Sequence, residues 1–100
     1  MSLSSVATRI RRIAPMAQAD IEEQARYFSE RSRSLVDQFL AAVNETFDAL
    51  LQAPEMGNPN RLPHLTTARI RTWTIRDYPH YMVFYRAITD GIEIVRVTCC

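Results

Sequence analysis

The fold is decided by residues 80–97, which read HYMVFYRAITDGIEIVRV. Segments 80–86 and 91–97 carry β-branched, aromatic and other apolar side chains on both alternating faces. Such a composition is typical of central strands that are covered, at least in part, on both sides. Between them, Asp90 and Gly91 form the dipeptide that favours a two-residue type I′ turn. The stretch therefore predicts an antiparallel hairpin.

The predicted turn also sets the register of this hairpin. Arg86 is expected opposite Val95 and diagonal to Glu93, and Arg96 is expected opposite Tyr85. Two interpretations of the arginines stay open. In one, they form a cationic pair for phosphate or carboxylate groups, which a guanidinium binds with two-pronged geometry. In the other, Arg86 forms a cross-strand ion pair with Glu93, and an arginine stem lies over Tyr85.

Two amphipathic helices are expected ahead of the hairpin. Pro15 suits the first position of a helix that runs to about Arg31, because its fixed φ fits there and its missing N–H leaves nothing unpaired. Ser32 or Ser34 can cap a second helix, which Pro54 ends. Apolar side chains repeat at helical spacing along one face of each helix: Ala17, Ile21, Ala25 and Phe28 in the first, and Leu35, Val36, Phe39, Leu40, Val43, Phe47, Leu50 and Leu51 in the second.

Two further strands and a loop complete the chain. Residues 6–13 and Arg69–Ile75 alternate in the manner of strands, whereas residues 54–63 hold three prolines and a glycine and predict a loop. The order strand, helix, helix, strand, strand, strand indicates one α+β domain over residues 1–100. In it, a helical hairpin packs on one face of a mainly antiparallel four-stranded sheet. The other face, or part of it, is then open to a partner.

The composition predicts a cytoplasmic globular protein. Twelve basic and eleven acidic residues give a net charge of +1, so the whole molecule lacks the field expected of a nucleic-acid or membrane-surface binder. No apolar run has the length of a membrane span or a signal peptide. The only cysteines, Cys99 and Cys100, are adjacent and suggest neither zinc nor a framework disulfide. We expect no membrane contact, no direct nucleic-acid binding, no metal and no cofactor.

Four segments, taken in order, resemble the ParE branch of the ParE/RelE toxin superfamily. They are Pro15–Phe28, Phe39–Leu51, Pro54–Pro59, and the pair of strands Tyr81–Arg86 and Asp90–Val97. The resemblance implies a small type II toxin that a cognate ParD-like antitoxin neutralises by wrapping its C-terminal segment over it, in a hetero-oligomer. ParE-type members poison DNA gyrase, whereas RelE-type members cut mRNA on the ribosome.

Departures from the family pattern bear on catalysis. Val97 is followed only by Thr98, Cys99 and Cys100, where the family commonly continues with Leu-His-Gly-Ala-Arg-Asp or a similar tail, and the chain contains no lysine. RelE-like nucleases carry part of their catalytic set on that tail and several lysines in the sheet. We therefore expect a toxin that acts by binding and has no catalytic residues. The alternatives are a RelE-like ribosome-dependent mRNA endonuclease that uses arginines, and an inactive relative that only binds antitoxin.

Candidate binding residues lie in the last three strands. Basic and aromatic side chains there suggest a surface for the antitoxin or the target: Arg69, Arg71, Trp73, Tyr81, Tyr85, Arg86 and Arg96. His64 and His80 are the only imidazoles, and both are expected to be ordinary surface residues. The acidic residues Asp20, Glu22, Glu23 and Glu30 are expected to form a solvated helix face without metal-ligand spacing.

Overall fold

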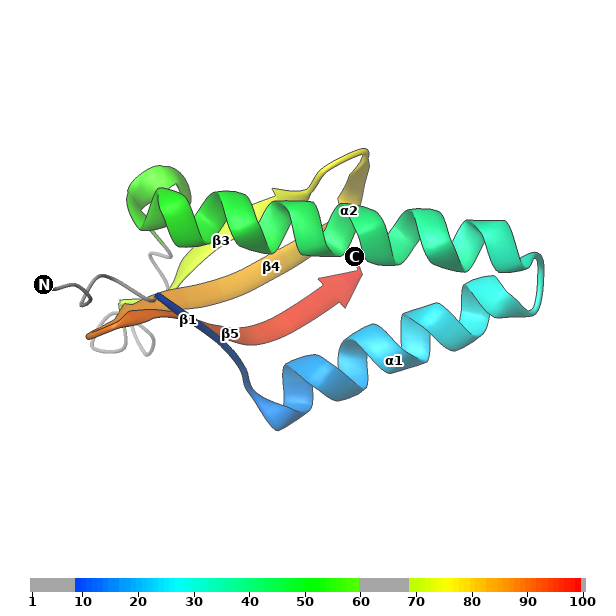
Figure 1. Cartoon of the computed structure of the whole chain (residues 1–100), viewed down its shortest axis with the longest axis horizontal. Coiled ribbons are helices and arrows are strands. Elements are labelled where there is room, and N and C mark those ends of the chain that lie inside the picture. The colour runs from blue at the N-terminus through cyan, green and yellow to red at the C-terminus, as the bar shows by residue number, and fades with distance from the viewer. Residues whose placement is uncertain (1–8, 60–68, 100) are drawn as a thin grey trace, which may run out of the picture.

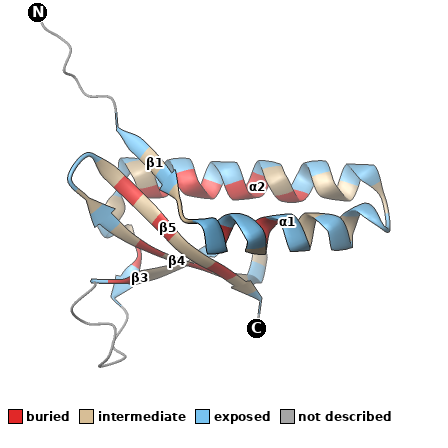
Figure 2. Cartoon of the chain, turned by 90° about the horizontal axis from the view of Figure 1, so that it is seen from below, coloured by how far each residue is buried: buried red, intermediate tan, exposed pale blue. Residues whose placement is uncertain are grey.

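The computed structural model describes residues 9–59 and 69–99. The predicted strand at 6–8, the loop at 60–63, His64 and Cys100 therefore lie outside the described residues. The chain forms two layers, in which helices α1 (Pro15–Ser29) and α2 (Arg33–Gln52) lie together on one side of a sheet (Figures 1 and 2). This arrangement confirms the predicted α+β fold. No described helix is long and apolar enough to cross a membrane.

The sheet has five strands in the spatial order β1-β5-β4-β3-β2. Their bounds are β1 Ile10–Ile13, β2 Asn58–Pro59, β3 Arg71–Ile75, β4 Tyr78–Ile88 and β5 Gly91–Cys99. Only the pairing of β1 with β5 is parallel. The prediction of four strands missed β2, because its two residues lie in a stretch rich in proline, and proline is tolerated in a sheet only at edges.

Both helices begin close to the predicted positions. Pro15 is the first residue of α1, as expected. The Ser32 hydroxyl accepts a hydrogen bond from the Ser34 N–H and caps α2. Arg31 lies in the tight connection between the helices rather than in α1, which ends at Ser29. A short 3₁₀ helix, η1 (Pro54–Met56), follows α2 and turns the chain toward β2.

The core lies between the helices and the sheet. The largest side chains that are fully buried there are Tyr85, Phe39, Phe47, Leu50, Ile75, Ile92, Ile94 and Val83. Four aromatic rings form a cluster at one end of this core, with centroids 5.0–6.4 Å apart: Phe28, Phe39, Tyr78 and Tyr81. Because these rings come from α1, α2 and β4, the cluster joins both helices to the central strand.

The register of the β4–β5 hairpin differs from the prediction. Ile88 pairs with Gly91, so the turn consists of Thr89 and Asp90, and Arg86 lies directly opposite Glu93. The expected pairing of Arg86 with Val95 is therefore wrong. So is the type I′ turn, because neither Asp90 nor Gly91 is among the described residues with positive φ.

A bulge accounts for the rest of the difference in register. The pairing shifts between Phe84, which lies opposite Arg96, and Tyr85, which lies opposite Ile94, so Val95 is the extra residue. The expected pairing of Arg96 with Tyr85 is wrong for this reason. The bulge leaves Val95 without a direct partner and returns Val97 to the helix-covered face, where it is buried.

Gly91 is needed for close packing rather than for turn geometry. The Ile10 N–H donates to the Asp90 carbonyl at 2.7 Å, which brings β1 directly against the start of β5. A Cβ at position 91 would lie 2.7 Å from Ile10 N and C and still closer to Ile10 O. Any side chain there would have to displace the backbone of β1, so the glycine fixes the one parallel pairing of the sheet.

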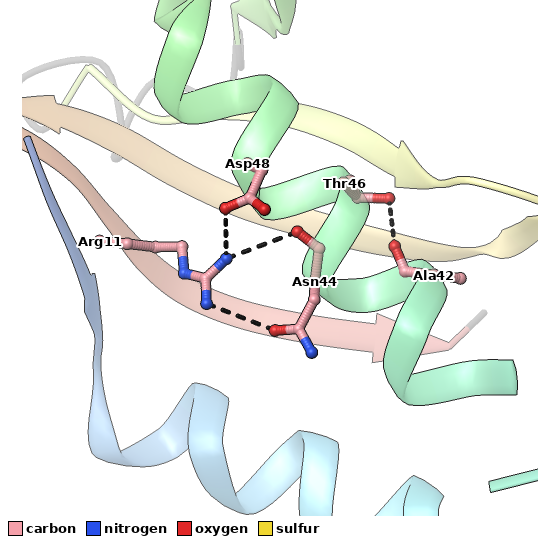
Figure 3. Close-up of polar contacts among 5 residues, drawn as sticks. All are labelled: Arg11, Ala42, Asn44, Thr46 and Asp48. Carbon is pink, nitrogen blue, oxygen red and sulfur yellow. Dashed lines mark hydrogen bonds and ion pairs between the residues drawn. The ribbon is translucent and has the colours of Figure 1, made fainter. Parts of the chain in front are cut away.

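Two sets of polar contacts hold α2 in place over the sheet, and Figure 3 shows the first of them, at Arg11. Arg11 on β1 donates to Asp48 Oδ1 at 2.7 Å and to the Asn44 carbonyl at 3.4 Å. The buried hydroxyl of Thr46 donates to the Ala42 carbonyl at 2.8 Å and accepts from the Arg76 N–H at 3.0 Å. These contacts place α2 across the sheet, from β1 at one edge to the turn between β3 and β4.

Candidate functional site

The seven candidate binding residues do not form one site. Arg86 and Arg96 lie on the sheet face opposite the helices, whereas Arg69 and Arg71 line a hollow beside the C-terminal end of α2. Trp73 is half-buried and packs against the core, and Tyr81 belongs to the aromatic cluster. Tyr85 is fully buried in the core. The seven residues are close in sequence, but their side chains lie on different faces of the sheet or within the core.

Tyr85 has a structural role that its burial makes clear. Its hydroxyl donates to the Pro54 carbonyl at 2.7 Å and accepts from the Gly57 N–H at 2.9 Å. The hydroxyl thus satisfies two backbone groups of the turn after α2. Burial raises the pKa of Tyr85, while the Gly57 N–H and the charge of Arg71 oppose that rise. The hydrogen bond donated to the Pro54 carbonyl requires the neutral hydroxyl.

Replacing Tyr85 by phenylalanine should lower the free energy of unfolding by about 1–2 kcal/mol, because Gly57 N–H and the Pro54 carbonyl lose a buried partner. Chemical denaturation monitored by circular dichroism measures this loss. Tyr27→Phe is the matched control, since Tyr27 is 48% exposed on α1. Equal stability of the Tyr85→Phe variant and the wild type would contradict the assigned role.

The hollow beside α2 is lined by arginines, two of which donate hydrogen bonds to backbone carbonyl groups. It has a volume of about 920 Å³. Arg71 Nη1 donates to the Gly57 carbonyl at 2.7 Å, and Arg9 Nη1 donates to the Leu51 carbonyl at 2.7 Å. The last turn of α2 contains no basic residue. Arg9, which directly precedes β1, therefore supplies the positive charge that the C-terminus of a helix favours.

Tyr81 is held from two sides. Its ring lies within the aromatic cluster, and its hydroxyl donates to Gln24 Oε1 on α1 at 2.9 Å. Burial, together with the neighbouring Cys99 and Tyr27, raises the pKa of Tyr81. The placement of Tyr81 and Tyr85 is that of core tyrosines, the ordinary role of such residues.

The face of the sheet opposite the helices contains a groove, called here the outer groove. Its walls and floor include Ala14, Phe84, Arg86, Val95, Arg96 and Thr98, and its volume is about 500 Å³. Apolar atoms make up most of its lining, and α1 and α2 lie on the other side of the sheet (Figure 2). Of the candidate residues, the structure brings Arg86 and Arg96 together here.

Each arginine of the outer groove is paired with a carboxylate. Arg86 Nη2 lies 2.7 Å from Glu93 Oε1, and Arg96 binds both oxygens of Asp20, at 2.8 and 3.1 Å. The ion pair of Arg86 with Glu93 was one of the two interpretations left open by the sequence. The side chains of Arg86 and Arg96 remain 44% and 40% exposed, so they still present donors at the rim of the groove.

The sequence predicted that Asp20 belongs to a solvated helix face, and this prediction is wrong. Only 16% of its side chain is exposed, and its Oδ2 also accepts from the Val97 N–H at 3.0 Å. β1 pairs with β5 only as far as Ile94, so α1 covers the edge of β5 beyond that point, and Asp20 satisfies the edge N–H. No helical pattern in α1 reveals this contact, because it depends on where β1 ends.

The pKa shifts of Asp20, Arg96 and the two tyrosines favour the ordinary charge state of each group. Burial alone would raise the pKa of Asp20, but the hydrogen bonds from Arg96 and Val97 and the charge of Arg96 lower it overall. The hydrogen bond and charge of Asp20 in turn raise the pKa of Arg96. The pKa values of Tyr81 and Tyr85 are raised as well, so each of the four groups has its pKa moved further from pH 7.

Within residues 9–59 and 69–99, no group of three or more His, Cys, Asp or Glu side chains could hold a metal ion.

Comparison with known proteins identifies the fold and the family. The solved structure of the chromosomal ParDE toxin–antitoxin system from P. aeruginosa matches with a TM-score of 0.73, covering 91% of this chain and 95% of that chain at 17% identity. A comparison with curated protein sequences gives no significant match. The family described as ParE toxin of type II toxin-antitoxin system, parDE, matches residues 11–99. The chain therefore belongs to the ParE toxin family of type II toxin–antitoxin systems.

Proposed function

We propose that this ParE-type toxin acts in the cytoplasm by binding DNA gyrase, and that a cognate ParD-like antitoxin neutralises it in a hetero-oligomeric complex. The observation that carries the proposal is the family match, which extends over residues 11–99 and thus includes both helices, strands β2 to β5 and all of β1 except its first residue. The chemistry of the described residues is consistent with a toxin that acts by binding. The raised pKa values of Tyr81, Tyr85 and Arg96 favour their ordinary charge states, and each of these side chains holds another part of the fold.

A supercoiling assay with purified components tests both halves of the proposal. The chain alone should inhibit DNA supercoiling by gyrase and trap cleaved DNA, and prior addition of the neighbouring gene's product should prevent this. That product should also elute together with the chain in size-exclusion chromatography. Full gyrase activity at saturating chain concentration would contradict the proposed target, and separate elution would contradict the proposed partner.

A further inference from the structure

The hollow beside α2 contains arginine side chains whose charge no described carboxylate neutralises. Ion pairs with carboxylates are found for arginines elsewhere in the fold, namely Arg11, Arg76, Arg86 and Arg96. Among the described residues, no such pair is found for Arg9, Arg69 or Arg71, which line the hollow. Because no neighbouring carboxylate cancels this local positive charge, it attracts anions even though the net charge of the chain is only +1.

Arg9 and Arg71 are fixed in position and still have donors to offer. Arg9 donates from Nη1 to the Leu51 carbonyl at 2.7 Å. Arg71 also donates from Nη1 only, to the Gly57 carbonyl at 2.7 Å and to the Glu55 carbonyl at 3.3 Å. Neither arginine donates from Nε or Nη2 to another described residue. That edge of a guanidinium is the one that binds two oxygens of an anion side by side.

Arg69 adds a guanidinium that the fold does not use. Its φ of 55° lies in the left-handed region, which residues other than glycine rarely adopt. The buried Ile70 lines the outer groove, whereas Arg69 and Arg71 on either side of it line the hollow. Arg69 is exposed, and no hydrogen bond or ion pair to another described residue is found for it. Backbone conformations of this kind cluster at ligand-binding sites, where the surrounding structure holds them.

The rest of the lining indicates the class of anion. The volume of about 920 Å³ suits an organic molecule better than a single small ion. Glu55 and Asp90 also line the hollow, so a ligand there meets acceptors for hydroxyl or amino groups as well as donors for an anion. Apolar side chains complete the lining and can cover a ring: Leu51, Pro54, Ala87 and Ile88. A phosphate, hydroxyl or amino groups, and a flat ring occur together in nucleotides.

We propose that the hollow beside α2 binds a nucleoside phosphate, either as a free nucleotide or at the end of a nucleic-acid strand. The phosphate is bound by Arg69 and by the Nε and Nη2 edges of Arg9 and Arg71. A protein carboxylate matches the site less well, because a phosphate has more oxygens with which to engage several guanidinium groups. This inference does not rest on the proposed function, since it involves neither gyrase nor the antitoxin.

Two pairs of matched variants test the hollow. Arg69→Gln removes one positive charge from it, and Arg33→Gln removes one from the exposed start of α2. Thr89→Glu adds a negative charge at the β4–β5 turn, and Thr74→Glu adds one at an exposed position of β3. Arg71 is left unchanged because it holds the turn after α2. Circular dichroism confirms that each variant is folded.

The probes are inorganic phosphate, adenosine monophosphate, and a short single DNA strand with or without a 5′-phosphate. Isothermal titration calorimetry measures the dissociation constant of each. Adenosine monophosphate or the 5′-phosphorylated strand should bind saturably and about tenfold more tightly than inorganic phosphate. Binding of adenosine monophosphate would identify a free nucleotide as the ligand. Binding of the strand that requires its 5′-phosphate would identify a strand end, and either result supports the proposal.

The two hollow variants should weaken this binding about tenfold or more, and the two control variants should stay within about twofold of wild type. Arg69→Lys should retain part of the affinity that Arg69→Gln loses, because it keeps the charge and loses only the planar fork. Wild-type binding should weaken as salt rises. If Arg69→Gln fails to fold, the pair Thr89→Glu and Thr74→Glu decides the question.

Three results would overturn the inference. Absence of saturable binding by both nucleoside phosphates would remove the site. Binding that is unchanged in both hollow variants would place the ligand elsewhere on the chain. Inorganic phosphate that binds as tightly as adenosine monophosphate would contradict the proposed class of ligand. None of these results bears on the proposed function, which is tested separately with gyrase and the neighbouring gene's product.

Discussion

Replacing Phe39 by alanine is expected to lower the free energy of unfolding by about 3–5 kcal/mol, the usual cost of emptying a buried aromatic position. Phe39 is fully buried, and its ring lies 5.0 Å from Phe28 and 5.4 Å from both Tyr78 and Tyr81. The loss removes the ring of α2 that contacts Phe28 of α1 and both tyrosines of β4. Urea denaturation followed by tryptophan fluorescence and circular dichroism measures it.

Phe84→Ala is the control for this substitution, because Phe84 lies on the other face of the sheet and lines the outer groove. It should cost clearly less stability than Phe39→Ala, since part of its ring is already exposed to water. Equal destabilisation by the two substitutions would mean that the outer face is a second core rather than a binding surface.

Replacing Asp20 by alanine is expected to cost about 2–4 kcal/mol, because its carboxylate accepts three hydrogen bonds, two of them from a guanidinium. The substitution leaves the Val97 N–H without a partner at the edge of β5 and detaches α1 from that edge. Asp37→Ala on the exposed side of α2 is the matched control and should change little. Asp20→Ala with wild-type stability would contradict the role given to this contact.

The contribution of Asp20 should also depend on pH in a defined direction. Its pKa is lowered in the folded chain, so its stabilisation is complete above the unfolded value of about 3.8 and is lost as pH falls through the folded value. The stability difference between wild type and Asp20→Ala should therefore be constant near neutrality and shrink below about pH 3.8. Denaturation curves collected from pH 7 to pH 2 measure it. A difference that grows on acidification would contradict the lowered pKa.

Periodicity was sufficient to predict the fold. The apolar stripes of α1 and α2 and the start of α1 at Pro15 are properties of single segments, and each is determined by local spacing. The register of the β4–β5 hairpin could not be predicted in this way. The dipeptide Asp90-Gly91 indicated a type I′ turn, but the glycine serves the close approach of β1, an element about 80 residues earlier in the chain.

The candidate site could be predicted only in part, for a related reason. A bulge places Val95 and Arg96 together on the outer face, and no residue type in the strand predicts that bulge. Asp20 was taken for a solvated residue because its partners come from β5. Each depends on contacts between segments that are distant in sequence.

The central claim, that this chain is a toxin which acts by binding gyrase, is tested most directly by inducing it in bacteria and identifying the damaged molecule. The account predicts growth arrest with gyrase-linked breaks in chromosomal DNA and intact mRNA, and recovery when the neighbouring gene's product is expressed with it. Cleaved mRNA on ribosomes without DNA breaks, or unimpaired growth with a folded and abundant chain, would contradict it.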